Sequence, residues 1–205
     1  MRHEFAFATA LLVFTSSASA ISVSTDPRQA PTGAYQLDPR HAQIQFAITH
    51  FGISDFFGRF ERASGTLNFN AADPAKSTVA ISIDTKSLST QNSALDNELQ
   101  GAPIFDTTRS PEATFKSTSV TRTGPNTGKI IGDLTIKGIT KPITLDVTYN
   151  GSTVSPLAAK TTLIGFRATG AIRRSDYNMT GVIWSSMVSD EVKLDIQAPF
   201  ANSKE

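Results

Sequence analysis

Hydrophobic and polar residues alternate along most of the chain. The alternation is clearest between Ala42 and Thr49, where every second residue is hydrophobic, as on one face of a β-strand. It breaks at Gly52, and five phenylalanines then occur between Phe51 and Phe69. An exposed hairpin does not need so many rings, so they predict either a thick core or the wall of an apolar pocket.

Similar strand signals recur as far as residue 200, with turn signals between them. One helix is predicted from Asn92 to Gly101, because Leu95 and Leu99 are four residues apart and Thr90 or Asn92 can cap the start. The predicted strands are a short one at 34–38 and then 42–49, 60–69, 78–84, 113–122, 129–137, 141–149, 161–174 and 189–200.

About eight strands with one helix inserted midway predict an all-β fold, an eight-stranded antiparallel lipocalin-like barrel. Closure removes the exposed strand edges that a long β protein otherwise has to protect. A barrel of eight strands can be filled by side chains or can hold one small ligand. A β-sandwich would give the same strand pattern. An outer-membrane barrel is disfavoured, since the chain has one Trp and three Tyr with which to build aromatic girdles.

The first twenty residues predict a signal peptide. The apolar run from Phe5 to Phe14 is too short to span a membrane, and Ala18-Ser19-Ala20 resembles a signal-peptidase site. We therefore expect an exported, periplasmic protein with no stable membrane insertion. The expected organisation is a signal peptide at 1–20, a disordered lead-in at 21–33, one domain at 34–201 and a tail at 202–205.

Composition narrows the possible chemistry. The absence of Cys excludes disulfides, thiol catalysis and thiolate metal sites. With 19 Lys and Arg against 18 Asp and Glu, the chain has no electrostatic signature of nucleic-acid binding. We find no catalytic or nucleotide-binding motif, so neither catalytic residues nor a cofactor are expected. His41 and His50 lie about 30 Å apart on one extended strand, so no metal site is expected from them.

Three polar groups each leave two interpretations open. His50 ends a predicted strand, either as a polar anchor at the mouth of an apolar pocket or as a histidine bonded to a nearby carbonyl. Asp96 and Glu98 are two apart on the helix, so they lie on different faces and are better placed in solvent than as an acid–base pair. Arg173 or Arg174 could bind an anion, and at most one of them can enter a pocket because they point to opposite faces of a strand. A surface ion pair with Asp176 is the default interpretation.

An ordered series of short motifs resembles the YceI-like family across nearly the whole chain after residue 34. The resemblance implies an elongated lipocalin-like barrel, often periplasmic, that encloses a long apolar tunnel and carries polyisoprenoids or similar amphiphiles without catalytic residues. It also implies that a homodimer is possible. The motifs are Tyr35-Gln-Leu-Asp38 with His41, His50-Phe-Gly-Ile-Ser, Gly58-Arg-Phe, Gly65-Thr-Leu, Ser87-Leu-Ser-Thr90, Phe105-Asp106, Pro111-Glu-Ala-Thr-Phe115, Gly132-Asp-Leu-Thr-Ile-Lys-Gly138, Arg174-Ser-Asp-Tyr177 and Val188-Ser-Asp-Glu-Val192.

The chain departs from the family pattern on the helix. Glu98 and Gln100 stand where family members usually have His and Arg, which lowers the positive charge there and favours a neutral or cationic lipid head group. His50, Arg59 and Asp96 match the pattern and are candidates for a polar mouth. The full set of predicted ligand-binding residues is Phe46, Ile48, His50, Phe51, Phe57, Arg59, Phe60, Asp96, Phe105, Phe115, Ile136, Phe166 and Trp184.

These observations predict a periplasmic carrier that holds a polyisoprenoid or another long-chain amphiphilic lipid in an apolar barrel. One alternative is a lipocalin-like isomerase or cyclase that uses His50 with Asp96 or Glu98. Another is a stress-induced structural protein whose side chains fill the barrel themselves.

Overall fold

The structure is a computed structural model that describes residues 21–158, 160–181 and 186–203. The predicted signal peptide and Trp184 lie outside the described residues.

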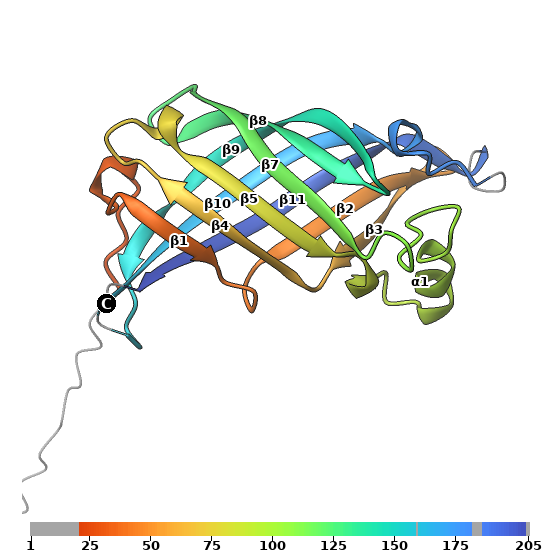
Figure 1. Ribbon diagram of the computed structural model, residues 1–205, viewed down its shortest axis with the longest axis horizontal. Helices are drawn as coiled ribbons and strands as arrows, with labels where there is room; N and C mark the ends of the chain where they lie inside the picture. Colours follow the sequence, from red (N-terminus) through yellow and green to blue (C-terminus); the bar gives the residue numbers. More distant parts are fainter. Residues whose placement is uncertain (1–20, 159, 182–185, 204–205) are drawn as a thin grey trace, which may run out of the picture.

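The described residues form an elongated barrel of antiparallel strands with one α-helix at one end (Figure 1). The helix α1 covers Ser93–Leu99. The strands are β1 (Gly33–Leu37), β2 (Gln43–His50), β3 (Ser54–Phe60), β4 (Ala63–Phe69), β5 (Thr78–Asp84), β6 (Leu88–Ser89), β7 (Glu112–Arg122), β8 (Thr127–Ile136), β9 (Ile139–Val154), β10 (Thr161–Arg173) and β11 (Val188–Ser203).

Eight strands close into a ring, in the order β1, β4, β5, β7, β8, β9, β10 and β11, with β11 returning to β1. β2, β3 and β6 continue members of this ring. β11 pairs with β2 through Leu194 and Phe46 and with β1 through Phe200 and Leu37, so β1 and β2 form one composite strand. β3 with β4, and β5 with β6, are joined in the same way. The prediction of an eight-stranded antiparallel barrel with one inserted helix is therefore confirmed, and the sandwich is excluded.

The segment predicted as one strand at 60–69 is instead the second half of a longer composite strand. Phe51 and Gly52 adopt positive φ angles of 50° and 72°, which turns the chain directly into β3. β3 gives way to β4 at Glu61, where the Glu61 N–H donates to the Ser87 carbonyl over 3.1 Å. β3 was missed because its two adjacent phenylalanines and its glycine interrupt the alternation of hydrophobic and polar residues.

The expected disordered lead-in at 21–33 is wrong for the part next to the barrel. Ser24 forms an antiparallel bridge with Ser152, with N–H···O distances of 2.9 and 2.8 Å. Asp26 caps the 3-10 helix at Pro27–Gln29, and Ala30 is buried. These are contacts with distant strands, so no local pattern signals them. At the other end, β11 includes residues 202 and 203, which we expected in the tail.

The predicted helix is present, and it begins where its capping residue predicts. The Asn92 side chain accepts from the Ala94 and Leu95 N–H groups over 3.1 and 3.3 Å. α1 and the loop that follows it lie at one end of the barrel, and the N-terminal segment and the C-terminus lie at the other (Figure 1). No helix among the described residues is both long and apolar enough to cross a membrane.

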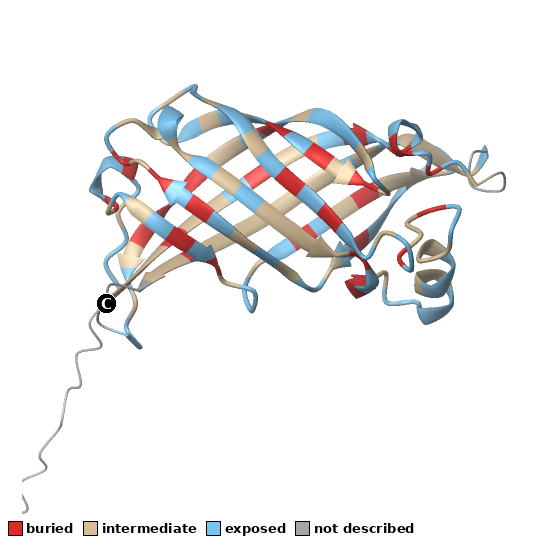
Figure 2. Ribbon diagram, in the orientation of Figure 1, coloured by how far each residue is buried: buried red, intermediate tan, exposed pale blue. Residues whose placement is uncertain are grey.

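The interior has two parts. At the end near the N-terminal segment, aromatic side chains are buried in one cluster, including Tyr35, Phe69, Tyr149 and Phe200. Toward α1, several apolar side chains on the inner face of their strands are only partly buried, and the ribbon in Figure 2 is tan along much of these strands. Inward-facing residues that keep accessible surface indicate that this part of the barrel is hollow.

Candidate ligand-binding site

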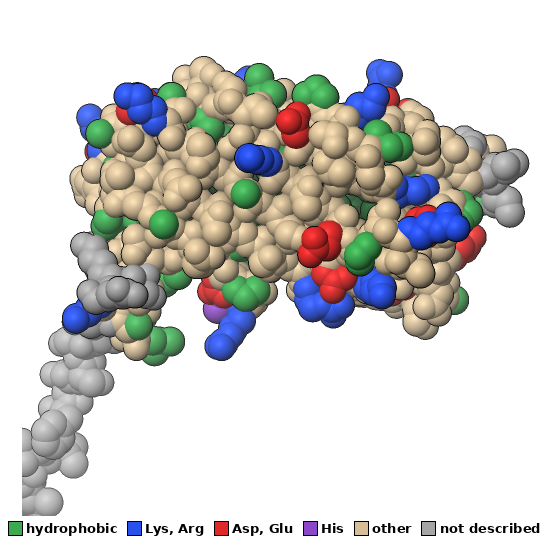
Figure 3. All heavy atoms as spheres, viewed as in Figure 1, with side chains coloured by type: hydrophobic (Ala, Val, Ile, Leu, Met, Phe, Trp, Pro, Cys, Tyr) green, Lys and Arg blue, Asp and Glu red, His purple; other side chains and the backbone are tan. Residues whose placement is uncertain are grey.

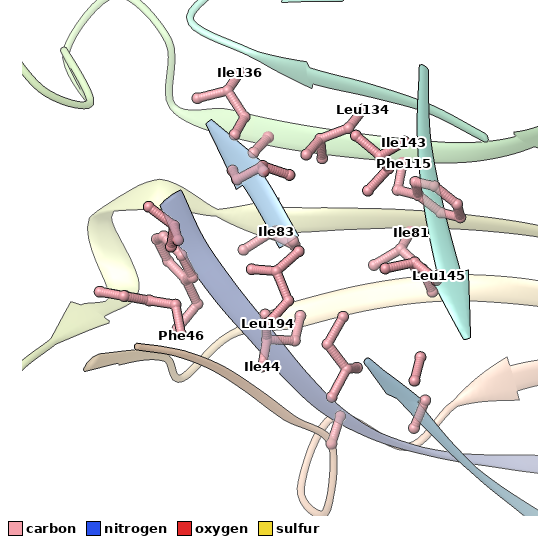
Figure 4. A pocket seen from close by; sticks show the side chains of 18 of the residues that line it. Ile44, Phe46, Ile81, Ile83, Phe115, Leu134, Ile136, Ile143, Leu145 and Leu194 are labelled. Atoms are coloured by element: carbon pink, nitrogen blue, oxygen red, sulfur yellow. The ribbon is translucent and has the colours of Figure 1, made fainter. Parts of the chain in front are cut away.

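A cavity of about 470 Å³ occupies the barrel interior. Its wall is formed by aliphatic and aromatic side chains that converge from different strands, including Ile83 of β5, Phe115 of β7, Leu145 of β9 and Leu194 of β11 (Figure 4). Cavities of this size, mostly apolar with few polar groups, are typical of small-molecule sites. The interior is therefore an apolar pocket and is not filled by its own side chains.

Glycines explain how a phenylalanine-rich barrel stays hollow. Phe46 of β2 lies directly opposite Gly58 of β3, and a Cβ atom at Gly58 would lie less than 3.0 Å from three ring carbons of Phe46. The Phe115 ring covers Gly132 of the neighbouring strand β8 in the same way. Because the outer end of each ring occupies space that a side chain at the glycine would otherwise fill, less of each ring needs to project into the lumen.

The cavity reaches the surface beside β3 and α1. Phe56 both lines the cavity and is 38% exposed, and Leu95 and Leu99 of α1 form the adjacent wall. Phe105, in the loop after α1, makes an edge-to-face contact with Phe60 at a centroid distance of 5.4 Å. We refer to this opening, bounded by these five residues, as the mouth.

Arg174 lies in the cavity wall, whereas the sequence predicted a surface position. It follows β10, is only 9% exposed and lines the cavity. Its Nη1 donates to the Met179 carbonyl over 2.7 Å and its Nε to the Ser189 carbonyl over 3.0 Å. None of the ion pairs among the described residues includes Arg174, so the expected surface pair with Asp176 is wrong. Nothing in the local sequence distinguishes this Arg from its exposed neighbour, because burial depends on how β11 packs beside it.

His50 is the other polar group at the same end. It lines the cavity, its ring lies 4.2 Å from that of Phe51, and its backbone pairs with Val188. The Val188 and Ser189 carbonyls also bind Arg174, so the two side chains flank the start of β11. Apart from Gln197, these are the only non-apolar residues on the described cavity wall.

Most of the predicted binding residues lie on this wall, although their role in binding stays a prediction. Phe51 and Phe57 are instead 58% and 63% exposed on the β2–β3 hairpin. Phe57 points outward because its neighbour Phe56 points inward, and side chains alternate along a strand. Trp184 lies outside the described residues. The predicted residues on the wall are Phe46, Ile48, His50, Phe60, Phe105, Phe115, Ile136 and Phe166.

The other two polar-mouth candidates are placed away from the cavity. Arg59 is exposed and pairs with Glu61 over 2.9 Å. The Asp96 carboxylate accepts from the Thr90 N–H over 2.7 Å and from the Thr90 hydroxyl over 2.6 Å, which ties α1 to the end of β6. Glu98 is exposed. The described wall therefore does not contain the carboxylate that an acid–base mechanism with His50 would require.

Several lining residues were not named from the sequence, although the signal for them was present. They belong to predicted strands and occupy the inward set of each alternation, as Ile81 and Ile83 do on β5 and as Val192, Leu194 and Ile196 do on β11. Selecting residues for aromatic bulk overlooked these aliphatic positions.

Apart from Arg174, the charged residues that the structure describes do not line the cavity. Arg167 binds Asp195 through two hydrogen bonds of 3.0 and 2.6 Å between neighbouring strands, and these bonds hold the pKa of Asp195 below its usual value. Charges of both signs are interspersed over the face shown in Figure 3. Among the described residues, no group of three or more His, Asp or Glu could hold a metal ion.

Comparison with known proteins agrees with this architecture. The model of the family described as the YceI-like domain matches residues 35–200. The chain belongs to the YceI-like family. It is 38% identical to Protein YceI of Shigella flexneri over 147 residues, which cover 71% of this chain and 75% of that protein.

Two solved structures of similar shape extend the comparison. The crystal structure of Burkholderia cenocepacia BcnA matches with a TM-score of 0.70 and 25% identity, and the match covers 80% of this chain and 98% of that one. A structure described as a polyisoprenoid binding domain from Saccharophagus degradans matches with a TM-score of 0.60, covering 81% and 97% of the two chains. At 18% identity, the second match supports the fold alone.

The two departures expected on the helix, Glu98 and Gln100, are not on the cavity wall. Glu98 faces solvent on α1, and the Gln100 side-chain amide donates to the Lys86 carbonyl over 3.4 Å. Arg174 places a positive charge on the wall itself. The absence of a His and an Arg at positions 98 and 100 therefore leaves a cationic group in the site.

Proposed function

We propose that this YceI-like protein is a non-enzymatic carrier that holds one long-chain lipid, a polyisoprenoid or an acyl lipid, inside its barrel. The observation that carries the proposal is the apolar cavity of about 470 Å³. Each CH₂ group moved from water into such a site contributes about 0.8 kcal/mol, so a long chain gains affinity without specific polar contacts. This physics favours a carrier with broad tolerance for chains of similar length.

The two ends of the cavity give the ligand a direction. His50 and Arg174 lie at the end that opens at the mouth, whereas the opposite end is aromatic. An amphiphile gains most when its polar head meets the charged and hydrogen-bonding groups and its tail fills the aromatic end. We propose that the head group lies near Arg174. A guanidinium favours a phosphate or carboxylate head, contrary to the neutral or cationic head expected from the family departures.

The proposed carrier acts after export. The apolar run and the small residues before Ile21 support secretion to the periplasm, where a lipid would need shielding from water. We also propose that the protein binds no nucleic acid and acts without inserting stably into the membrane. A homodimer remains part of the proposal on the strength of the family resemblance. No observation at the cavity favours the enzymatic alternative, since the carboxylates that it requires lie elsewhere.

Native mass spectrometry of the protein, purified from periplasm without detergent, tests the carrier function. We expect a bound lipid in about one-to-one ratio, with its chemical class given by solvent extraction. A protein that is isolated empty and also takes up no added long-chain lipid would refute the proposal. The same experiment on the cell fractions tests the location, because a protein retained with its first twenty residues in the cytoplasm would contradict export.

A matched pair of variants on β11 links binding to the cavity. Leu194→Gln places an amide on the cavity wall, and Lys193→Gln changes the adjacent outward residue. We expect the first to lower lipid occupancy at least about tenfold and the second to leave it unchanged, since burying an unpaired amide is costly. Equal occupancy in both variants would place the lipid outside the barrel.

A further inference from the structure

The barrel contains a second, smaller cavity beyond the first. It has a volume of about 90 Å³ and lies toward the aromatic end, where its wall includes Phe69 and Tyr149. Five residues line both cavities and so form the partition between them. Each comes from a different strand: Leu67 of β4, Val79 of β5, Ile130 of β8, Val147 of β9 and Phe166 of β10.

Phe166 is the only aromatic residue in this partition. Its ring makes edge-to-face contacts with Tyr149 at 5.4 Å and Phe69 at 6.2 Å, which line the small cavity. On the other side it contacts Phe200 at 6.1 Å, which lines the large cavity. Phe166 therefore stands between the two cavities and is held by rings from both.

The inward side chains of β10 change abruptly in size at Phe166. The next inward position on β10 toward the mouth is Ala168, whose small side chain lines the large cavity. A β-bulge between Gly165 and Phe166 shifts the register with β9 at this point, so that Phe166 pairs with Tyr149. A lipid tail that advances from the mouth passes Ala168 and then meets the Phe166 ring, which its three aromatic neighbours hold in place.

We propose that Phe166 sets the length of the lipid tail that this carrier accepts. The inference rests on the proposed lipid-binding function and adds to it a specificity-determining residue and a length class. A 150 Å³ protein cavity holds benzene, so each carbon needs about 25 Å³. By that measure the large cavity of about 470 Å³ holds roughly 19 carbons, or about four isoprene units. The small cavity of about 90 Å³ would hold roughly four more carbons, just under one isoprene unit, if the partition were opened, and the space freed by the Phe166 ring would add to it.

The test measures affinity against tail length for linear prenyl alcohols of two to seven isoprene units, by displacement of a fluorescent polyene fatty acid. For the unchanged protein, each added unit should raise affinity at least about tenfold until about four units are buried, because unburied carbons contribute nothing. Longer alcohols should then bind within about threefold of the four-unit compound.

Two variants should move this plateau in opposite directions. Phe166→Ala joins the cavities and should extend the rise to five or six units. Ala168→Phe adds a ring on the mouth side of Phe166 and should stop the rise at about three units. Phe166→Leu provides a milder opening should the alanine variant fold poorly, since large-to-small changes in a core are destabilising. Phe105→Ala removes a ring at the mouth, and it should weaken every alcohol without moving the plateau.

The outcomes separate this inference from the function on which it rests. If the unchanged protein binds the alcohols but the plateau stays at the same length in the Phe166 and Ala168 variants, the length-setting role is refuted and the carrier function stands. If the unchanged protein binds none of the alcohols and no other lipid, the carrier proposal fails, and the inference fails with it.

Discussion

Cross-strand neighbours of one ring and one glycine, directly opposite for Phe46 and Gly58 and diagonal for Phe115 and Gly132, keep the centre of the barrel open. Phe46 and Gly58 face each other across β2 and β3, and the absence of a Cβ at Gly58 gives the ring a place against the wall. The same arrangement at Phe115 and Gly132 involves a backbone carbonyl as well, so Gly58 is the cleaner position to test.

Gly58→Ala should therefore have a larger effect on lipid affinity than on the free energy of unfolding. The methyl group would displace the Phe46 ring toward the lumen, where it takes the place of several ligand carbons. We expect a loss of lipid affinity of about tenfold or more, since each lost CH₂ contact costs about 0.8 kcal/mol. Gly165→Ala is the control, because its Cβ would meet only an ordinary contact at 3.8 Å. If Gly58→Ala binds lipid like the unchanged protein, the ring does not limit the lumen.

A buried hydroxyl near α1 gives the protein a predictable alkaline response. Tyr177 is 1% exposed, and its hydroxyl has no hydrogen-bond partner in the part of the chain that the structure describes. Burial, with a contribution from the charge of Asp176, raises the pKa of Tyr177 from 10.0 to about 12. The neutral form is favoured in the folded state. The resulting contribution to the free energy of unfolding is fully present below pH 10. It is lost as the pH rises from 10 toward 12, because Tyr177 ionises at lower pH in the unfolded chain than in the folded protein.

Tyr177→Phe should move the midpoint of alkaline unfolding to higher pH. At pH 7 it should keep or raise the free energy of unfolding, because it removes an unpaired buried hydroxyl. Tyr35→Phe is the contrasting variant. The Tyr35 hydroxyl donates to the Pro31 carbonyl over 2.7 Å, so its loss should cost about 1 kcal/mol at pH 7. Circular dichroism during denaturant and pH titrations measures both effects, and equal destabilisation by the two variants would contradict the prediction.

Among the elements, α1 is distinctive because it belongs to the mouth and not to the barrel wall. It is short, and an isolated helix of this length is unstable in water. Its position depends on Leu95 and Leu99 facing the cavity and on the bond between Asp96 and Thr90. α1 therefore covers the mouth, and a mutation can weaken its attachment without unfolding the barrel.

Asp96→Ala should loosen α1 without unfolding the strands. It removes two hydrogen bonds that a carboxylate accepts, and each such bond contributes at most about 1.5–3 kcal/mol. Glu98→Ala is the control, because Glu98 is exposed on the same helix. Hydrogen exchange should accelerate across residues 90–107 but not across β7 to β10, and bound lipid should dissociate faster. Unchanged exchange over the helix would show that packing alone holds α1 in place.

At the scale of the whole molecule, the barrel has two chemically different ends. One end is aromatic and closely packed, and the other is covered by α1 and carries His50 and Arg174. The ring closes through β1 and β11, and β2 and β3 extend the wall beyond that seam to form the mouth. Under the proposed function, this asymmetry would hold an amphiphile in a single orientation.

Local patterns in the chain were enough to predict the class of fold and much of the cavity wall. Alternation from Ala42 to Ile48 identified an inward face, and all four of its hydrophobic residues line the cavity. The helix could be predicted from Asn92 and the spacing of its leucines, because capping and periodicity are local. The strand number and the two-residue period predicted an all-β fold, and the pairing of β1 with β11 decided for a barrel over a sandwich.

Which side chains meet and which spaces stay empty depends on how distant strands pack together. Phe56 and Phe57 are adjacent and chemically identical, yet one lines the cavity and the other faces solvent, because strand register fixes the direction of each. The burial of Arg174 depends on the carbonyls of β11, which lie fifteen residues away for Ser189. The partition at Phe166 requires rings from several strands, so no single stretch of the chain could reveal it.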